Sequence, residues 1–540
     1  MKRSVAIILI VVISVAAVAL VAFVGKGAVT VIGQIGDIFG SGGEFPDLPS
    51  APNSSDLPHE SDTGLKFTDT EPIETEPTLP SLNSGKLKFD GLALTMLLPD
   101  TELYHREWGQ KVAQDEVDEA VEMRNLDILN DLDVEVLYKF VPTDTDEFFD
   151  LALGDVLRDE HNYDIALNGS AVMSRLALRS ALSDMHDSAS FPFLDLTLPC
   201  WSASANENLT LGGKLYFTTG FFSTTMLDNT TVMFQNKTIY DKNRTDSDPE
   251  NLQVYANEGK WTYEDMYRMT SAFAASMPND DVLIIDRDVS DNDILRSFAA
   301  AFEARAMRRY NNSWEYDLVS NSRAEAVLTR TKELYSTPGV VVGETAKFAG
   351  ETAKFAGGKR IACEGIFFIT KLYKDYETNM SIREMEDKFG LMPLPKYDAA
   401  QEQYKALSDG GSFIGILDHS RSDAKTHSIA VSAFVEKTAE RSYNQVLGYY
   451  FNRVVKPKYF GTDDQMGTVT HSIEAFDTII HNIEFEFCNV YSSELGGIGD
   501  IWGDAYAEDL TLEQAYNARK EEYRQALDAL DSLTAMIEQK

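Results

Sequence analysis

The segment Trp201–Asn236, WSASANENLTLGGKLYFTTGFFSTTMLDNTTVMFQN, decides how this chain is expected to fold. A Gly-Gly turn precedes a short strand that ends at Tyr216 and Phe217. A polar stretch dotted with aromatic residues follows, and a second strand ends at Asn236. The pattern predicts a chain that leaves one lobe, lines a cleft and enters another lobe. We therefore interpret the segment as a ligand-binding crossover, because no catalytic motif accompanies it.

Alternating strand and helix patterns precede this crossover. Short apolar or alternating runs predict strands at 92–98, 134–140 and 163–167, and polar periodic stretches predict helices at 107–132 and 145–158. Strand–helix order of this kind implies α/β architecture, with a mostly parallel sheet flanked by helices. Ligands in such sheets lie beyond the carboxyl ends of the strands, which directs attention to residues 100–104 and 168–170.

The chain after the crossover is richer in helices. We expect a helix that begins after Thr262 as its N-cap, and further helices at 293–309, 324–335, 425–438, from 443 onward and at 512–539. Strands are expected at 389–395, which ends in prolines, and at 412–417. The second of these strands would return the chain to the first lobe.

Composition narrows the class of protein. The chain has 540 residues, enough for two or three domains, and its 86 acidic against 48 basic residues give a net charge of −38. Such a surface disfavours nucleic acid as a partner. The three cysteines are far apart, and the eight histidines show no metal-ligand spacing, so we expect no metal, no cofactor and no disulfide framework. The heptapeptide GETAKFA at 343–349 is repeated at 350–356, which we interpret as a tolerated duplication.

The N-terminal residues have the pattern of a targeting or membrane-anchoring segment. Lys2 and Arg3 precede 21 uncharged residues, 4–24, which is long enough for a bilayer-spanning helix. We expect residues 1–30 to be a membrane anchor or a cleaved signal segment, with everything after residue 30 outside the cytoplasm. Residues 44–85 contain seven prolines and nine acidic side chains, so 31–85 is expected to be a disordered acidic linker.

Four sequence stretches together resemble the bacterial extracellular solute-binding proteins of ABC importers, family 1, the carbohydrate-type binding proteins. NENLTLGGKLY at 206–216 is similar to the family's N-G-K-x-Y strand, and FQNK at 234–237 stands where Y-N-K is usual. The other three are EGKWTYED at 258–265, FAGGKRIA at 355–362 and KFGLMPLPKY at 388–397, which occur in the family's order. No cysteine that could carry a lipid precedes Cys200, which is a departure from the family pattern.

The resemblance implies a two-lobed, periplasmic-binding-protein-like fold of type II, with a ligand in the cleft between the lobes. Lobe 1 would comprise residues 86–223 and 406–447, and lobe 2 would comprise 224–405 and 448–540 with the C-terminal helix. Binding would close the lobes, and the closed monomer would meet membrane permease subunits.

Sugar recognition requires flat apolar faces and planar hydrogen-bonding groups. The aromatic candidates are Trp201, Tyr216, Phe221, Trp502 and Tyr506, of which the last two lie in a glycine-rich stretch, 496–506, that we expect to be a loop. The polar candidates are Asp100, Glu102, Asn168, Thr218, Thr219, Glu364 and Asp409. Each of these residues could instead be an ordinary core or surface side chain.

Two alternatives remain open from the sequence. A membrane-tethered ligand sensor would use the same anchor, linker and cleft. A glycoside-processing enzyme would need two carboxylates that face each other across the cleft, but G-x-S-x-G, H-E-x-x-H, C-x-x-C and P-loop motifs are absent from the sequence. We therefore expect a non-enzymatic protein that binds a small solute, with a carbohydrate as the first choice.

Overall fold

The computed structural model describes residues 79–142, 145–286, 288–310, 313–343, 364–372, 382, 387–419, 424–455 and 463–538. The expected anchor, nearly all of the expected linker, the repeated GETAKFA beyond Gly343, the FAGGKRIA stretch and Cys363 lie outside these residues. Within the described part of the chain, no helix combines the length and apolarity that crossing a bilayer requires.

The described residues form two five-stranded sheets, of which the first has the order β2-β1-β3-β13-β4. Its strands are β1 (Leu92–Pro99), β2 (Val134–Val141), β3 (Ile165–Asn168), β4 (Phe217–Thr218) and β13 (Phe413–Ile416). β1 pairs in parallel with both β2 and β3, whereas β13 runs antiparallel to β3 and β4. The mostly parallel first sheet expected from the sequence is confirmed, with one antiparallel strand inserted.

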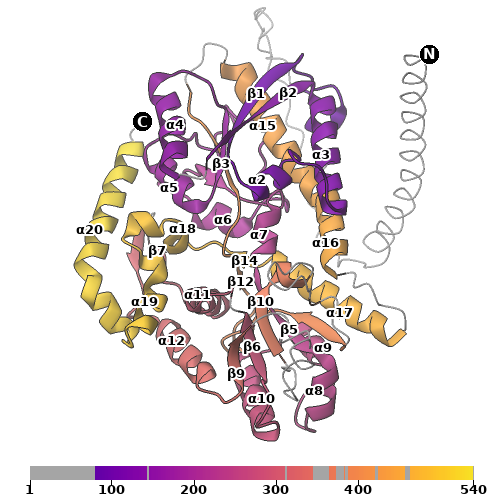
Figure 1. Cartoon of the computed structure of the whole chain (residues 1–540). Helices are drawn as coiled ribbons and strands as arrows, with labels where there is room; N and C mark the ends of the chain where they lie inside the picture. The colour runs from indigo at the N-terminus through magenta and orange to yellow at the C-terminus, as the bar shows by residue number, and fades with distance from the viewer. Residues whose placement is uncertain are drawn as a thin grey trace, which may run out of the picture. The chain divides into compact units, whose positions relative to one another are not determined.

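Helices cover both faces of this first sheet, as the near-continuous apolar strands require. Leu94, Met96 and Leu98 face a core shared with α3 (Glu116–Leu132) and α15 (Ala424–Arg441). The alternate residues Leu97 and Ala166 face a core shared with α4 (Thr145–Arg158) and α5 (Ser170–Leu178). Figure 1 shows these two helix pairs on opposite sides of the sheet.

The second sheet has the order β11-β5-β10-β6-β9. Its strands are β5 (Thr231–Asn236), β6 (Leu283–Asp286), β9 (Val340–Gly343), β10 (Glu364–Phe368) and β11 (Phe389–Met392). β5 is antiparallel to β10 and β11, whereas β6 pairs in parallel with β9 and β10. In each sheet, therefore, the antiparallel strand is the one by which the chain enters from the other sheet.

Helices of the second half pack around this second sheet. The longer ones are α10 (Tyr263–Ser276), α11 (Asp291–Ala301), α12 (Ser322–Tyr335), α16 (Leu447–Val455) and α17 (Asp463–Ile480). The shorter ones are α8 (Lys237–Asn243), α9 (Leu252–Asn257), α18 (Phe487–Val490) and α19 (Ile501–Ala507). Three other short helices, α2 (Glu102–Glu107), α6 (Ala203–Asn208) and α7 (Thr224–Asp228), precede β5 in the chain and do not belong to this group. The N-cap predicted at Thr262 is confirmed, because its side chain accepts from the Asp265 N–H in a capping box.

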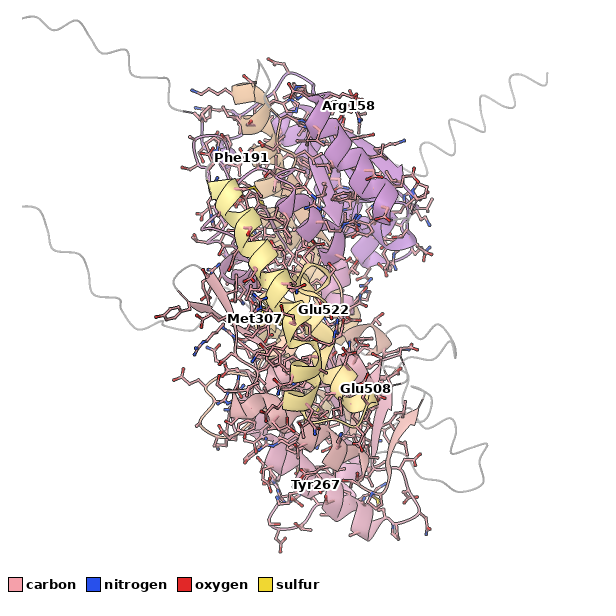
Figure 2. All side chains as sticks on the ribbon, turned by 90° about the vertical axis from the view of Figure 1, so that its left-hand side faces the viewer. Arg158, Phe191, Tyr267, Met307, Glu508 and Glu522 are labelled. Atoms are coloured by element: carbon pink, nitrogen blue, oxygen red, sulfur yellow. The ribbon has the colours of Figure 1, made fainter. Side chains whose placement is uncertain are left out.

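The C-terminal helix α20 (Leu512–Glu538) contacts elements beside both sheets, namely α12 and α5. It buries Leu512, Ala515, Tyr523 and Leu530 along one face, the helical spacing of an amphipathic helix. In Figure 2 it lies at the front, with Glu522 on it and Glu508 just before its start. The helix predicted at 512–539 is thereby confirmed.

Three expected elements differ in the structure. The helix expected at 107–132 begins only at Glu116, because Asp115 caps it by accepting from the N–H groups of Val117 and Asp118. The helix expected at 293–309 ends at Ala301, and β7 (Met307–Tyr310) pairs with β8 (Ser313–Tyr316) in a two-stranded sheet after it. The loop expected at 496–506 is mostly helical, with η6 (Ile498–Asp500) followed by α19.

Candidate functional site

Two segments that carry the chain between the sheets bond to each other. The first crossing segment, residues 219–230, links β4 to β5, and the second, residues 405–412, leads from the second sheet back to β13. The Asp409 N–H donates to the Asn229 carbonyl at 3.0 Å, and the Ser412 N–H donates to Ser223 Oγ at 2.9 Å. These hydrogen bonds hold the two crossings side by side.

The buried carboxyl of Glu107, at the end of α2, fastens the crossings to the first sheet's helices. Its Oε1 accepts from the Thr225 N–H at 3.2 Å, and its Oε2 accepts from the Ser412 hydroxyl. Burial raises the pKa of Glu107, while these hydrogen bonds oppose the rise. A single side chain thus reaches one residue of each crossing segment.

A cleft of about 330 Å³ opens beside the second crossing segment. Its walls come from the residues after β3, from Phe413 of β13, from α11, from the second crossing segment and from the residues around α18, so elements from both halves of the fold contribute to it. The lining residues are Gly169, Ser170, Arg296, Leu407, Ser408, Asp409, Gly410, Gly411, Phe413, Glu484, Phe485, Glu486, Asn489, Val490, Ser492, Gly499 and Asp500. This volume suits a small solute.

Charged side chains give the cleft its chemistry. Arg296 is the cation of the lining, and its Nη1 lies 3.3 Å from Asp409 Oδ1. The Nε of Arg296 is buried and has no hydrogen-bond acceptor among the described residues. Because Arg296 remains 18 % exposed, its guanidinium is placed to donate hydrogen bonds to a solute.

Two glutamates on the floor of the cleft are almost fully buried. Glu484 lies in β14 (Ile483–Glu484), which pairs with β12 (Ala406–Leu407), and its carboxylate binds Lys405 Nζ at 2.5 Å. Glu486, two residues later, accepts from the Cys488 thiol at 3.3 Å, and burial raises its pKa to about 7. Burial also raises the pKa of Asp409, and the nearby Asp293 adds to the rise. The oxygens of the Glu486 and Asp409 carboxyls can accept hydrogen bonds from a solute.

The N-terminus of α5 completes the polar lining. Gly169 is the N-cap and offers no side-chain cap, and Ser170 follows it at the cleft. Asn168, at the end of β3, accepts from the Gly169 N–H through Oδ1 at 2.7 Å. The helix start therefore presents backbone donors and a partial positive charge toward the same space.

The structure brings two of the polar candidates to this cleft. Asp409 lines it, and Asn168 lies immediately beside the lining residues Gly169 and Ser170. Thr218 and Thr219 are buried behind it, where their hydroxyls donate to Asn206 Oδ1 and to the Ser412 carbonyl. Thr219 therefore links the two crossing segments, Thr218 bonds to α6, and neither has exposed surface for a solute.

The other polar candidates lie away from the cleft lining. Asp100 and Glu102 are exposed at the carboxyl end of β1, where Asp100 pairs with His105 at 2.7 Å. Glu364 is buried within β10 of the second sheet and accepts from the Thr270 hydroxyl at 3.2 Å. Burial raises the pKa of Glu364 to about 8.

The aromatic candidates are mostly core residues. Trp201 donates from Nε1 to Glu436 at 3.1 Å, and Trp201 and Phe221 line a separate hollow of about 190 Å³. Tyr216 is buried in the large core. Phe413 and Phe485 line the cleft but pack edge-to-face against each other, with little exposed surface.

Trp502, which the sequence predicted to contact a solute from a loop, is instead a core residue. Trp502 is 0 % exposed in α19, and its Nε1 donates to the Ala324 carbonyl at 3.0 Å, so a solute cannot reach it. Gly496 and Gly497 adopt left-handed conformations that turn the chain, and the residues after them form a helix that packs against α11, α12 and α20. Tyr506, on the same helix, is half-buried against Tyr335.

Sequence reasoning missed Arg296, Glu484 and Glu486. Arg296 lies in the middle of an ordinary amphipathic helix, which has no local sign of a binding residue. The alternation in Ile483-Glu-Phe-Glu-Phe487 was the available signal, because period-two patterns place alternate residues on one face.

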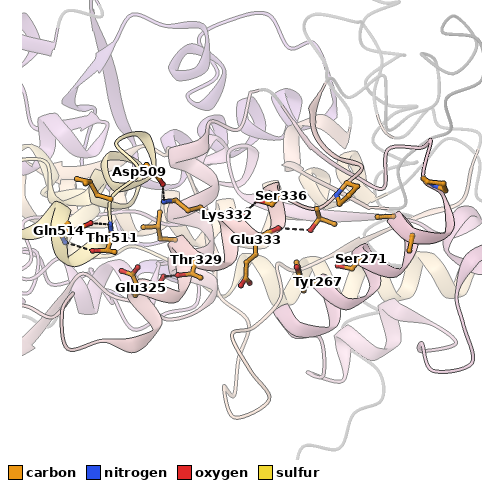
Figure 3. Close-up of a pocket in the computed structure, with 17 residues that line it drawn as sticks. Tyr267, Ser271, Glu325, Thr329, Lys332, Glu333, Ser336, Asp509, Thr511 and Gln514 are labelled. Carbon is orange, nitrogen blue, oxygen red and sulfur yellow. Dashed lines mark hydrogen bonds and ion pairs between the residues drawn. The ribbon is translucent and has the colours of Figure 1, made fainter.

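A larger hollow, of about 950 Å³, lies among α10, α12 and the start of α20 (Figure 3). Its lining includes Tyr267, Glu325 and Thr511, and Lys332 Nζ pairs there with Asp509 at 2.8 Å. Neither the first sheet nor a crossing segment contributes to this groove. We therefore consider the smaller cleft, which the first sheet, the second crossing segment and α11 line together, the candidate site.

Comparison with known proteins shows the fold. No family model and no curated protein matches the sequence. The solved structure of the cyclic α-maltosyl-1,6-maltose binding protein from Arthrobacter globiformis matches with a TM-score of 0.52 at 13% identity, over 82% of this chain and 99% of that one. Two others have TM-scores of 0.50 at 13% identity. The sugar-binding protein MalE from Xanthomonas citri matches over 83% and 100% of the chains. The galacto-N-biose/lacto-N-biose I-binding protein of the ABC transporter from Bifidobacterium longum matches over 82% and 98%.

These solved structures belong to sugar-binding proteins, and at this identity they establish a shared fold. The chain therefore has the α/β, two-domain, periplasmic-binding-protein-like fold that the four sequence stretches predicted.

Proposed function

We propose that this protein is an extracellular solute-binding protein that captures a small carbohydrate in the cleft and delivers it to the permease subunits of an ABC transporter. The observation that carries the proposal is the cleft itself, which is lined by the first sheet's strand ends, by α11 from the other half of the fold and by the second crossing segment between them. The shared fold with sugar-binding proteins supports the assignment.

The chemistry of the lining favours a neutral, hydroxyl-rich solute. Arg296 and the start of α5 offer donors, and the carboxyls of Asp409, Glu486 and Asp500 offer acceptors. Four acidic side chains against one arginine disfavour an anionic solute. The volume of about 330 Å³ suits a ligand of one or two sugar rings.

The proposed lobes are 86–223 with 406–447, and 224–405 with 448–540, in a type II arrangement. The single antiparallel strand of each sheet, β13 or β5, supports the divisions near residues 223 and 405, because each strand follows a crossing segment. Solute would bridge the two walls and favour closure about the crossing segments, whose mutual hydrogen bonds would serve as the hinge.

The setting of the protein follows from the sequence. We infer that the uncharged residues 4–24 anchor the chain or are cleaved as a signal, and that the folded part works as a monomer on the outer face of the membrane. Binding without chemical turnover is expected, because the shared fold is that of binding proteins.

Thermal unfolding with a panel of mono- and disaccharides tests the proposal. A sugar at about 100 times its Kd should raise the free energy of unfolding by about 2.7 kcal/mol. The sugar should be recovered unchanged after incubation, which separates binding from glycoside hydrolysis. Amino acids and polyamines serve as comparison ligands. Stabilisation by a cationic ligand and by no sugar would overturn the carbohydrate assignment.

A further inference from the structure

The end of the first sheet that lies away from the cleft brings two distant histidines together. β13 runs antiparallel to β3, with Ile416 opposite Ile165 and Phe413 opposite Asn168. Residues just after β13 therefore lie beside residues just before β3, at the opposite end of these strands from Asn168. His419 and His161 meet there, with their ring centroids 4.7 Å apart.

Asp159 completes a group of three potential metal ligands. One ligand atom from each of Asp159, His161 and His419 lies within 4.8 Å of the others, and His161 Nε2 is 3.1 Å from Asp159 Oδ1. Zinc bonds to imidazole nitrogen and carboxylate oxygen at about 2.0–2.2 Å, so modest side-chain rotations would bring all three atoms to one ion. The group is the one cluster of this kind among the described residues.

Neighbouring groups fix the orientation and the tautomer of the His419 ring. Its side chain is only 6 % exposed, and its Nε2 donates to the Tyr163 carbonyl at 2.7 Å. Because a carbonyl only accepts, this bond selects the tautomer that keeps a lone pair on Nδ1. Orientation of this kind by a backbone carbonyl is typical of metal-binding histidines.

Asp155 fixes both the histidine and the loop that carries His161. Its buried carboxylate lies 3.4 Å from His419 Nε2, and it accepts from the N–H groups of Asn162 and Tyr163 at 3.1 and 3.2 Å. Asp155 therefore acts as an outer partner that holds the ligand-bearing residues 159–163 against His419.

We propose that Asp159, His161 and His419 bind a divalent transition-metal ion of the zinc type, outside the solute cleft. Two imidazoles and one carboxylate form a ligand set that suits zinc and its neighbours better than magnesium or calcium, which prefer oxygen ligands. Three protein ligands leave a coordination position for water. The ion would tie the loop before β3 to the segment after β13, at the strand ends that lie away from the cleft.

Calorimetric titration of the full chain with ZnCl2, after dialysis against a chelator, tests this site. The wild-type chain should bind an equivalent of zinc that His161→Ala and Asp159→Asn each lose or bind at least about tenfold more weakly. His186→Ala is the matched control, because His186 is a partly exposed histidine near Asp184 in the same half of the chain, and it should bind zinc as the wild type does. MgCl2 should give no comparable binding.

Both test residues are partly or largely exposed, with Asp159 at 51 %, so the variants are expected to fold. Circular dichroism confirms folding, and an unchanged response to the solute would show that the cleft is intact. Zinc binding of equal strength in the wild type, His161→Ala and Asp159→Asn would overturn the proposal, and so would a wild-type chain that binds no zinc.

Discussion

The cleft and the core behind it use opposite kinds of side chain. Charged residues such as Arg296, Asp409 and Glu486 supply the polar groups of the cleft, and its apolar lining residues have little exposed surface. The large aromatic residues Trp502 and Trp201 are buried outside the cleft. The difference indicates that a solute would be recognised by directed hydrogen bonds, while the aromatic residues would supply the rigidity that holds those groups in place.

Replacing Trp502 tests the core side of this comparison and has the largest expected effect. Trp502→Ala removes a fully buried ring and its hydrogen bond to Ala324, so the free energy of unfolding should fall by about 3–5 kcal/mol. Denaturant titration measures the loss. The additional stability that a bound sugar confers should persist. A Trp502→Ala protein with normal stability that binds no sugar would show that Trp502 contacts the solute.

Glu364 is a carboxyl of the core, in contrast to the carboxyls of the cleft. Its pKa of about 8 lies above the ordinary value, so the folded state holds a proton there that the unfolded state releases near pH 4.5. The stability that this proton provides is complete below pH 4.5 and is lost as the pH rises through about 8.

Glu364→Gln removes this ionisable group while keeping a similar shape. Between pH 5 and pH 9 the wild type should lose roughly 2–4 kcal/mol of unfolding free energy that the variant keeps, at about 1.4 kcal/mol per pKa unit. Denaturant titrations at the two pH values measure this difference. Glu513→Gln, at an exposed position in α20, should change the pH dependence little. Equal pH profiles for wild type and Glu364→Gln would show that Glu364 ionises normally.

Local sequence patterns predicted most of the scaffold. The apolar run at 92–98, the crossover at 201–236 and the return strand at 412–417 each carry their own signal of strand, turn or cap. The rule that ligands lie beyond the strand ends predicted Asn168, which lies beside the cleft. The return crossing predicted Asp409, which lines the cleft.

The rest of the site depends on contacts between distant parts of the chain. Arg296 comes to Asp409 only because α11 packs beside the second crossing segment, and nothing near residue 296 indicates this. His161 meets His419 because β13 is antiparallel to β3, a pairing that spacing along the sequence does not reveal. Trp502 was misplaced because glycines suggested a loop where they actually turn the chain into a buried helix.

Replacing Arg296 tests the cleft side of the comparison. Arg296→Gln removes the cleft's cationic donor, so sugar affinity should fall by about 10- to 100-fold, the usual worth of a hydrogen bond to a charged group. Stability without sugar is measured in parallel, because the variant also removes the ion pair between Arg296 and Asp409. Calorimetry measures the affinity. Arg308→Gln, an exposed arginine in β7 that pairs with Glu315, should bind sugar normally. Equal losses in both variants would argue against a specific role for Arg296.

The smallest expected effect concerns Glu486 on the cleft floor. With a pKa of about 7, its carboxyl is mainly neutral at pH 6 and mainly ionised at pH 8. Charge-assisted hydrogen bonds are stronger, so affinity for a neutral sugar should rise by a few-fold, roughly, between these pH values. Glu486→Gln should flatten this dependence in calorimetric titrations at both pH values. A sugar whose affinity stays constant with pH in the wild type would place its hydroxyls away from Glu486, and recognition would then depend on Arg296, Asp409 and the start of α5.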